Sequence, residues 1–145
     1  MQEEKENRPT GQSVYGIVFN AERTEVLLVK RRDIPVWVLP GGGLDPDESE
    51  AEGAVREVLE ETGLEATTGE FQFACEFIDG TFHAIELFFA VNIKGGHLFK
   101  GSDPETGEKQ IITDVKYLSI EEISRMTAET RNENSMAEIR NKTFF

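Results

Sequence analysis

The chain has 145 residues, a length that suits one domain, and 38% of them are hydrophobic, which is enough for an ordinary core. It has no apolar run of about eighteen residues and its charged start lacks an apolar stretch, so neither a membrane-spanning helix nor a signal peptide is expected. The net charge of −13, without a basic stripe, argues against a nucleic-acid partner, although metal ions can join an acidic protein to an anionic small molecule.

The single cysteine, Cys75, lies inside an apolar run and can form neither an internal disulfide nor a Cys-rich zinc site. We therefore expect it to be a buried small hydrophobic residue in a reduced, cytoplasmic protein. Residues 1–12 are polar and are expected to form a flexible N-terminal segment ahead of a single domain over residues 13–145. The sequence leaves the oligomeric state open between a monomer and a homodimer.

The first part of the chain predicts three short strands. Apolar runs bounded by polar turns are typical of strands, and the third run is stopped by Pro40 and three consecutive glycines. The predicted ranges are 14–19, 25–29 and 36–39.

Residues 49–62 have the apolar period of an α-helix. Ser49 followed by Glu52 forms a capping box that places the start of this helix, and Gly63 stands where a left-handed C-terminal cap is expected. Apolar residues at three- and four-residue steps predict its core-facing stripe. That stripe consists of Ala51, Val55, Val58 and Thr62.

The second half predicts a hairpin, a long loop, a late strand and a short helix. Asp79-Gly80 is expected to turn the hairpin, and residues 94–110 form a polar loop of a length that is often functional. Ser119 with Glu122 caps the short helix. Strands that flank one strong helix indicate an α/β or α+β class. The predicted strands are 71–78, 82–93 and 115–118.

Three carboxylates share one face of the predicted helix, because Glu57, Glu60 and Glu61 stand at positions i, i+3 and i+4. Like charges one turn apart destabilise a helix by roughly 0.2–0.5 kcal/mol per pair, and the helix dipole disfavours anions in the last turn. A divalent cation removes both penalties, and carboxylates with water and phosphate are the ligands that Mg²⁺ prefers. From the helix alone, a solvated acidic face is the alternative.

The glycines at 41–43 precede this helix and let the backbone approach a ligand or metal closely, although a plain flexible turn is the alternative. The Gly-Lys-Ser/Thr of a Walker-type phosphate loop is absent. Arg56 can pair with Glu52 and Glu60, each four residues away. It forms either an ordinary helical salt bridge or a support that orients the ligand carboxylates.

Basic residues at 30–32 end the second predicted strand. They are either solvent-exposed charges or a binding site for phosphate. Because neighbouring strand residues point to opposite faces, only one of Arg31 and Arg32 is expected to face the substrate. Arg32 is preferred because it is nearer to the glycine loop. Glu86 interrupts an apolar run, so its carboxylate should face a cleft or a partner and is a candidate substrate contact.

Other conspicuous side chains have ordinary structural interpretations. Trp37 stands between two valines, so core packing is favoured over stacking on a base. His83 is expected to be a framework residue in a strand, and His97 to be exposed. No serine or cysteine stands out as a nucleophile, so we expect metal-activated water to attack one phosphorus of a pyrophosphate.

The stretch from Gly42 to Leu64 resembles the Nudix box at every fixed position of that motif and covers its 23 residues. Leu39-Pro40-Gly41, just before it, also resembles the family. The matching positions are Gly42, Glu48, Arg56-Glu57-Val58, Glu60-Glu61 and Gly63-Leu64. The gaps between them are five, seven, one and one residues, in that order.

The resemblance implies the Nudix fold, a mixed β-sheet sandwiched between α-helices, of the α/β class. It implies Mg²⁺- or Mn²⁺-dependent hydrolysis of a nucleoside diphosphate derivative, with a small-molecule nucleotide as partner and neither nucleic acid nor a membrane. In such enzymes the carboxylates matching Glu57, Glu60 and Glu61 bind the metal, and the carbonyl matching Gly41 often adds a ligand. The residues that support the loop and helix match Gly42, Glu48, Arg56 and Gly63.

The resemblance leaves the general base open. Family members often use an acidic residue from the loop before the late strand, for which Asp103, Glu105 and Glu108 are candidates. None of them has the expected spacing from Tyr117, so Glu57 is the alternative base.

The substrate is not settled by the resemblance either. The proline expected in ADP-ribose hydrolases and the tyrosine expected in dinucleoside polyphosphate hydrolases are both missing downstream of the box. A MutT-like hydrolase of nucleoside triphosphates or of a related small nucleotide is therefore favoured. ADP-ribose or dinucleoside polyphosphate hydrolysis and a non-catalytic nucleotide-binding domain are the alternatives.

Overall fold

The computed structural model describes residues 10–32, 37–79, 82–98 and 112–125. Within these ranges the chain forms a mixed four-stranded sheet, a three-stranded antiparallel sheet, a two-stranded ribbon and two helices. The loop acids Asp103, Glu105 and Glu108, and Gly80 of the predicted hairpin turn, lie outside the described residues.

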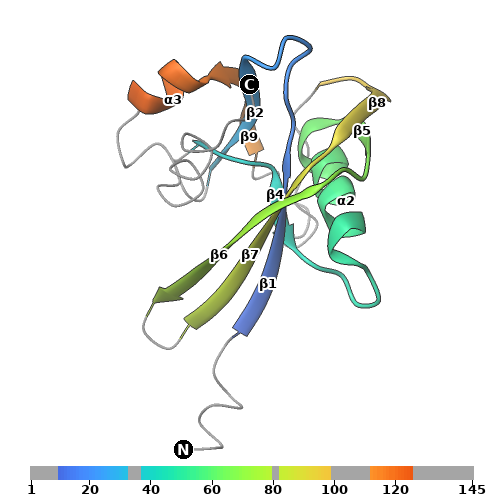
Figure 1. Ribbon diagram of the computed structural model, residues 1–145, viewed down its shortest axis with the longest axis vertical. Coiled ribbons are helices and arrows are strands. Elements are labelled where there is room, and N and C mark those ends of the chain that lie inside the picture. Colours follow the sequence, from blue (N-terminus) through green and yellow to red (C-terminus); the bar gives the residue numbers. More distant parts are fainter. Residues whose placement is uncertain (1–9, 33–36, 80–81, 99–111, 126–145) are drawn as a thin grey trace, which may run out of the picture.

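The four-stranded sheet has the order β4-β1-β7-β6 and extends away from the rest of the molecule (Figure 1). The β1 strand pairs parallel with β7 and antiparallel with β4, while β6 and β7 form an antiparallel hairpin. The strand bounds are β1 Thr10–Ile17, β4 Gly41–Gly43, β6 Phe71–Asp79 and β7 Phe82–Ala90.

The smaller sheets complete the β structure. The three-stranded sheet has the order β3-β2-β9, and the ribbon pairs β5 with β8. Their bounds are β2 Glu25–Arg31, β3 Trp37–Val38, β9 Ile112–Ser119, β5 Leu64–Thr67 and β8 Asn92–Gly96.

Two buried clusters form on opposite faces of β1, because alternate residues of a strand point to opposite sides. Val14 packs with Ala54 and Val58 of the helix α2, Glu50–Thr62. Ile17 packs in the other cluster, between the four-stranded and three-stranded sheets and the helix α3, Ile120–Arg125. The resulting helix–sheet–sheet arrangement agrees with the predicted α/β class.

Both predicted ends of α2 are confirmed. Ser49 Oγ accepts a hydrogen bond from the Glu52 amide at 3.1 Å, and the Ser49 amide donates to Glu52 Oε1 at 2.9 Å. Gly63 ends the helix with a left-handed φ of 84°. The capping box of α3 also forms, between Ser119 and Glu122.

The predicted core stripe of α2 is partly wrong. Ala51 and Val55 are only half-buried, whereas the buried face includes Glu57 and Glu61. The helix lies against β1 and β4 with a face that carries glycine, alanine and two acids, and hydrophobic periodicity cannot recognise such a face. The residues buried in the structure are Gly53, Ala54, Glu57, Val58, Glu61 and Thr62.

Three strand predictions also need correction. The glycine run forms β4, β5 was not predicted, and the strand expected over 82–93 is two strands separated by Val91. The Val91 amide donates to the Ile17 carbonyl at 3.1 Å, where the chain leaves one sheet for the β5–β8 ribbon. In addition, β1 begins at Thr10, inside the segment expected to be flexible, because β7 supplies backbone partners from that residue onward.

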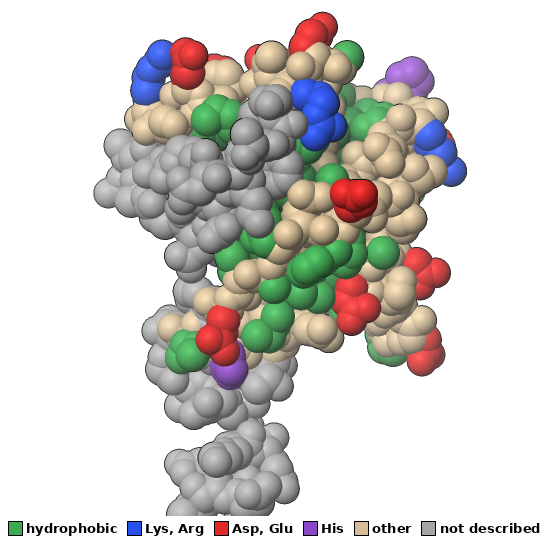
Figure 2. Space-filling model, viewed as in Figure 1, with side chains coloured by type: hydrophobic (Ala, Val, Ile, Leu, Met, Phe, Trp, Pro, Cys, Tyr) green, Lys and Arg blue, Asp and Glu red, His purple; other side chains and the backbone are tan. Residues whose placement is uncertain are grey.

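The surface agrees with the acidic composition. On the face drawn in Figure 2, lysine and arginine side chains of the described residues form no continuous patch, and hydrophobic side chains gather near the middle. Phe71 and Ile78 of β6, the edge strand of its sheet, are 53% and 60% exposed. In the described part of the chain, neither helix has the length and hydrophobicity needed to cross a membrane.

We predict that Gly63→Ala destabilises the protein by about 1 kcal/mol, because a side chain is disfavoured at the left-handed φ of 84° that closes α2. Gly11→Ala is the matched control, because a Cβ at this β1 position meets nothing within 4 Å. Urea unfolding of the two variants measures both effects. Equal stabilities would contradict the role assigned to the Gly63 cap.

Candidate active site

The glycine strand β4 places its backbone directly against the carboxylates of α2. The Gly41 amide donates a hydrogen bond to Glu61 Oε1 at 3.1 Å. A Cβ added to Gly42 would lie 2.8 Å from Glu57 Oε1, so only glycine leaves room for this carboxylate. The glycines therefore form an ordered strand that contacts the acids, and the flexible-turn interpretation is wrong.

Two of the three predicted carboxylates are buried. Glu57 and Glu61, one helical turn apart, are each only 1% exposed, and the Glu60 side chain is 25% exposed at the rim. Buried carboxylates require compensating donors or cations, since an isolated buried charge is strongly disfavoured. The last turn of α2 contains no basic residue, so compensation comes from an earlier turn of the helix and from other elements.

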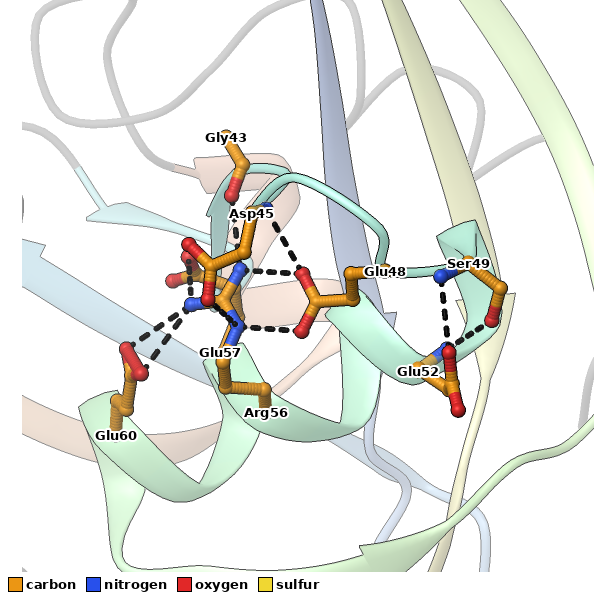
Figure 3. A network of polar contacts seen from close by, with 8 residues as sticks. All are labelled: Gly43, Asp45, Glu48, Ser49, Glu52, Arg56, Glu57 and Glu60. Carbon is orange, nitrogen blue, oxygen red and sulfur yellow. Dashed lines mark hydrogen bonds and ion pairs between the residues drawn. The ribbon is translucent and has the colours of Figure 1, made fainter.

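Arg56 supplies much of this compensation (Figure 3). Its Nη1 donates to Glu57 Oε1 at 3.0 Å and to Glu60 Oε2 at 3.1 Å, and its Nη2 donates to the Gly43 carbonyl at 2.9 Å. Its Nε donates to Glu48 Oε2 at 2.7 Å. These contacts join the loop, the glycine strand and the acidic face of α2 through one guanidinium.

The electrostatics of the Arg56–Glu48 pair follow from these contacts. The hydrogen bonds from Arg56 lower the pKa of the Glu48 carboxyl, and those to Glu48 raise the pKa of Arg56 above its usual value. Glu48 also accepts a hydrogen bond from the Asp45 amide at 3.0 Å, which closes the loop onto the helix. Glu48 therefore connects the loop at Asp45 to Arg56 of the helix.

The predicted partners of Arg56 are half right. Glu60 contacts Arg56, whereas Glu52 lies apart and is engaged with Ser49 in the capping box (Figure 3). Asp45, which was not predicted, lies 3.2 Å from Arg56 Nε. The loop folds back over the helix, and spacing within the helix alone does not reveal that approach.

The two arginines at the end of β2 differ in their placement. Arg31 Nη1 lies 3.8 Å from Glu61 Oε2, close enough for an ion pair but too far for a hydrogen bond. The Arg31 side chain is 19% exposed, and Arg32 is exposed. The residue nearer to the acidic face is thus Arg31, not the preferred Arg32, because β2 alternation and a register shift between Lys30 and Arg31 decide which side chain faces inward.

Glu86 finds a partner, as expected for a carboxylate in an apolar strand. The Tyr15 hydroxyl donates to Glu86 Oε2 at 3.0 Å. Burial, followed by the charge of Glu86, raises the pKa of Tyr15 above its usual range, so the phenol remains a donor. Tyr15 was not among the predicted site residues, because only the β1–β4 and β1–β7 registers bring it beside both Gly41 and Glu86.

Four conspicuous side chains lie outside the acidic site. Trp37 is 8% exposed and belongs to the buried core, which confirms the core interpretation. His97 is exposed, and His83 pairs on the surface with Glu76 at 2.6 Å. Cys75 is half-buried and packs against the core.

The donor types at the site suit a hard divalent cation, which prefers carboxylate oxygens and water. In the described residues, however, no three acidic, histidine or cysteine side chains are gathered closely enough to form a complete cage. Arg56 holds Glu57 and Glu60 from one side. Mg²⁺ usually retains several waters and uses few protein ligands, so an incomplete cage of this composition is compatible with it.

We predict that Arg56→Ala lowers the free energy of unfolding by about 2 kcal/mol, because it leaves the buried Glu57 and its neighbours without their cation. Denaturant unfolding in the presence of a chelator measures this loss in the metal-free protein. Arg125→Ala is the control, since its ion pair with Glu121 is exposed on both sides and should not affect stability measurably. Equal stability of the two variants would contradict the assigned role.

Part of the chain is similar in sequence to curated proteins. A putative 8-oxo-dGTP diphosphatase of Bacillus subtilis is 58% identical over 55 residues, which are 38% of this chain and 36% of that protein. The diphosphoinositol polyphosphate phosphohydrolase 3-alpha of Homo sapiens is 46% identical over 55 residues, 37% of this chain and 34% of that protein. The chain thus spans about a third of the length of these curated relatives.

The similarity in fold extends over nearly the whole chain. The crystal structure of a MutT protein from Methanosarcina mazei Go1 matches with a TM-score of 0.72 and 25% identity, covering 94% of this chain and 99% of that one. The model of the NUDIX domain matches residues 9–139. The resemblance predicted from the box is therefore confirmed, and the chain belongs to the NUDIX domain family.

Proposed function

We propose that this protein hydrolyses the pyrophosphate bond of a nucleoside triphosphate or a related nucleotide, by a divalent-metal-dependent attack of water. The observation that carries the proposal is the pair Glu57 and Glu61, two buried carboxylates one turn apart beside a glycine strand. Two like charges near the C-terminal end of a helix destabilise it. Such a pair is expected at a functional site where a bound cation offsets that cost and holds an anionic ligand.

Glu57, Glu60 and Glu61 are the proposed ligands of Mg²⁺ or Mn²⁺, with the Gly41 carbonyl as a further candidate. Support comes from their hard oxygen donors and from Gly42, whose missing side chain leaves space beside the Glu57 carboxylate. When bound, such a cation neutralises phosphate charge and lowers the pKa of a water ligand. Phosphoryl transfer depends mainly on positioning and charge neutralisation, so no protein nucleophile is required.

The side chains of this site have separable roles in the proposal. Arg56 orients Glu57 and Glu60 through its 3.0 and 3.1 Å hydrogen bonds, and it keeps the loop at Glu48 in place. Glu57 is the proposed proton acceptor among the described residues. The loop acids at 103, 105 and 108, which were the other candidates, lie outside the described residues.

For the phosphate chain, Arg31 is now the proposed contact in place of Arg32. Its guanidinium lies 3.8 Å from Glu61, so it reaches the acidic end of the site. A guanidinium is also the group whose planar donors match the oxygens of a phosphate. Arg32, which is exposed, has no comparable position in the structure.

The names of two relatives bear on the class of nucleotide. One relative is named a putative 8-oxo-dGTP diphosphatase, which favours a nucleoside triphosphate, but another is named for diphosphoinositol polyphosphates. Relatives matched over stretches of equal length thus carry names for different substrates. ADP-ribose and dinucleoside polyphosphates are therefore included in the test.

We predict that hydrolysis requires a divalent cation and that Glu57→Gln lowers kcat by at least about a hundredfold, because a carboxylate charge at the reacting centre is lost. Chromatography of the products from a nucleotide panel measures the rate and also shows which phosphorus is attacked. The matched control is Glu65→Gln, an exposed carboxylate on β5. Undiminished turnover in excess chelator would disprove the metal-dependent mechanism.

We further predict that Arg31→Ala raises KM several-fold with a smaller effect on kcat, as expected when a contact is equally strong in the ground and transition states. Arg32→Ala should resemble the wild type, because its side chain lies on the surface. Steady-state kinetics of the two variants separate these expectations. A larger KM effect for Arg32→Ala would restore the assignment made from sequence.

A further inference from the structure

Glu86 is a half-buried carboxylate on the face of the four-stranded sheet that also carries Tyr15 and Phe88. Its neighbours across the sheet are Ser13 on β1 and Cys75 on β6. Next to it along the same face lie Tyr15 and Phe88, whose rings are stacked with centroids 5.0 Å apart. A carboxylate among aromatic and aliphatic neighbours needs a reason, because the same position would be more stable with an apolar side chain.

Among the described residues, no cationic side chain pairs with this carboxylate. Within the described part of the chain, Glu86 has its hydrogen bond from the Tyr15 hydroxyl and forms no ion pair with lysine, arginine or histidine. Burial raises the pKa of Glu86, against the opposite influence of the Tyr15 hydrogen bond. The neutral Tyr15 phenol therefore orients the Glu86 carboxylate without neutralising its charge. The carboxylate oxygens can still accept a hydrogen bond from another donor.

Tyr15 connects this carboxylate to the proposed metal ligands. A Cβ on Gly41 would lie 2.2 Å from Tyr15 Cδ1, so the ring packs directly against the glycine strand. The amide of the same Gly41 donates to Glu61.

We propose that Glu86, held in position by Tyr15, accepts hydrogen bonds from N–H groups of the substrate's nucleobase and thereby selects guanine. This inference rests on the proposed function, because it assumes that a nucleotide phosphate chain lies at Glu57 and Glu61. An ionised carboxylate only accepts hydrogen bonds. Guanine presents two adjacent N–H donors on one edge, whereas uracil presents a single donor between two carbonyls that would face the carboxylate unfavourably.

The test compares kcat/KM for GTP, ITP, UTP and dGTP in the wild type, Glu86→Gln and Tyr15→Phe. Glu86→Gln should lower the value for GTP by about tenfold or more, because hydrogen bonds to a charged acceptor are lost. UTP should be affected little, and the preference for GTP over ITP, which lacks the 2-amino group, should diminish. Tyr15→Phe keeps the ring and should give a weaker form of the same change.

The matched control is Glu76→Gln, which removes an exposed carboxylate of β6 that pairs with His83. Thermal unfolding of each variant shows whether the fold is retained. Calorimetric binding of GMP and UMP is measured in parallel. If the wild type hydrolyses no nucleotide, the proposed function fails, and the effect of Glu86→Gln on GMP binding still decides the base assignment.

Several results would overturn the assignment. Equal losses for every nucleotide, together with a changed Mg²⁺ dependence, would make Glu86 a metal ligand. If Glu86→Gln lowers kcat/KM for GTP but not for dGTP, the group that donates to Glu86 is the ribose 2′-hydroxyl and not the base. An unchanged ratio of GTP to UTP in both kcat/KM and monophosphate binding would show that Glu86 does not read the base.

Discussion

The guanidinium of Arg56 is the interaction on which the rest of the acidic site depends. Two of its nitrogens bind Glu48 and the Gly43 carbonyl, and the third binds Glu57 and Glu60. A guanidinium suits this role because its donors form a rigid planar fork and it stays charged at all relevant pH values. A lysine would supply the charge, but its single ammonium group lacks the planar set of donors that contacts the loop, the strand and the helix together.

This arrangement explains how a helix can carry three acids near its C-terminal end. The helix dipole and the like charges disfavour such a sequence in isolation. In the folded chain, Arg56 of the same helix contacts Glu57, Arg31 approaches Glu61 from β2, and the Gly41 amide approaches Glu61 from β4. The acids are thus stabilised without metal by groups from three elements, and they retain a composition suited to a divalent cation.

The four-stranded sheet joins this centre to a second polar position. Tyr15 lies between them, because its ring packs on Gly41 and its hydroxyl reaches Glu86. A rigid strand is a suitable support for recognition, since neighbouring strands fix its position along their full length. The chemistry proposed at α2 and the selectivity proposed at Glu86 would then share one framework, and each could vary among relatives without the other.

Local sequence determined much of this protein. The box spacing predicted the family, and the limits of α2 followed from Ser49, Glu52 and Gly63, because capping depends on residues a few positions apart. The burial of Trp37 was also predictable from its apolar neighbours in the sequence, and the proximity of the three glutamates on α2 was predictable from their spacing.

The tertiary structure decided what distant segments contribute. Sequence periodicity treats acids as exposed, so it could not show that Glu57 and Glu61 are buried against a glycine strand. It could not choose between Arg31 and Arg32, because the register of β2 sets which one faces Glu61. Tyr15 and Glu86 are 71 positions apart, and only the parallel pairing of β1 with β7 brings them into contact, because sheet register is a property of the whole fold.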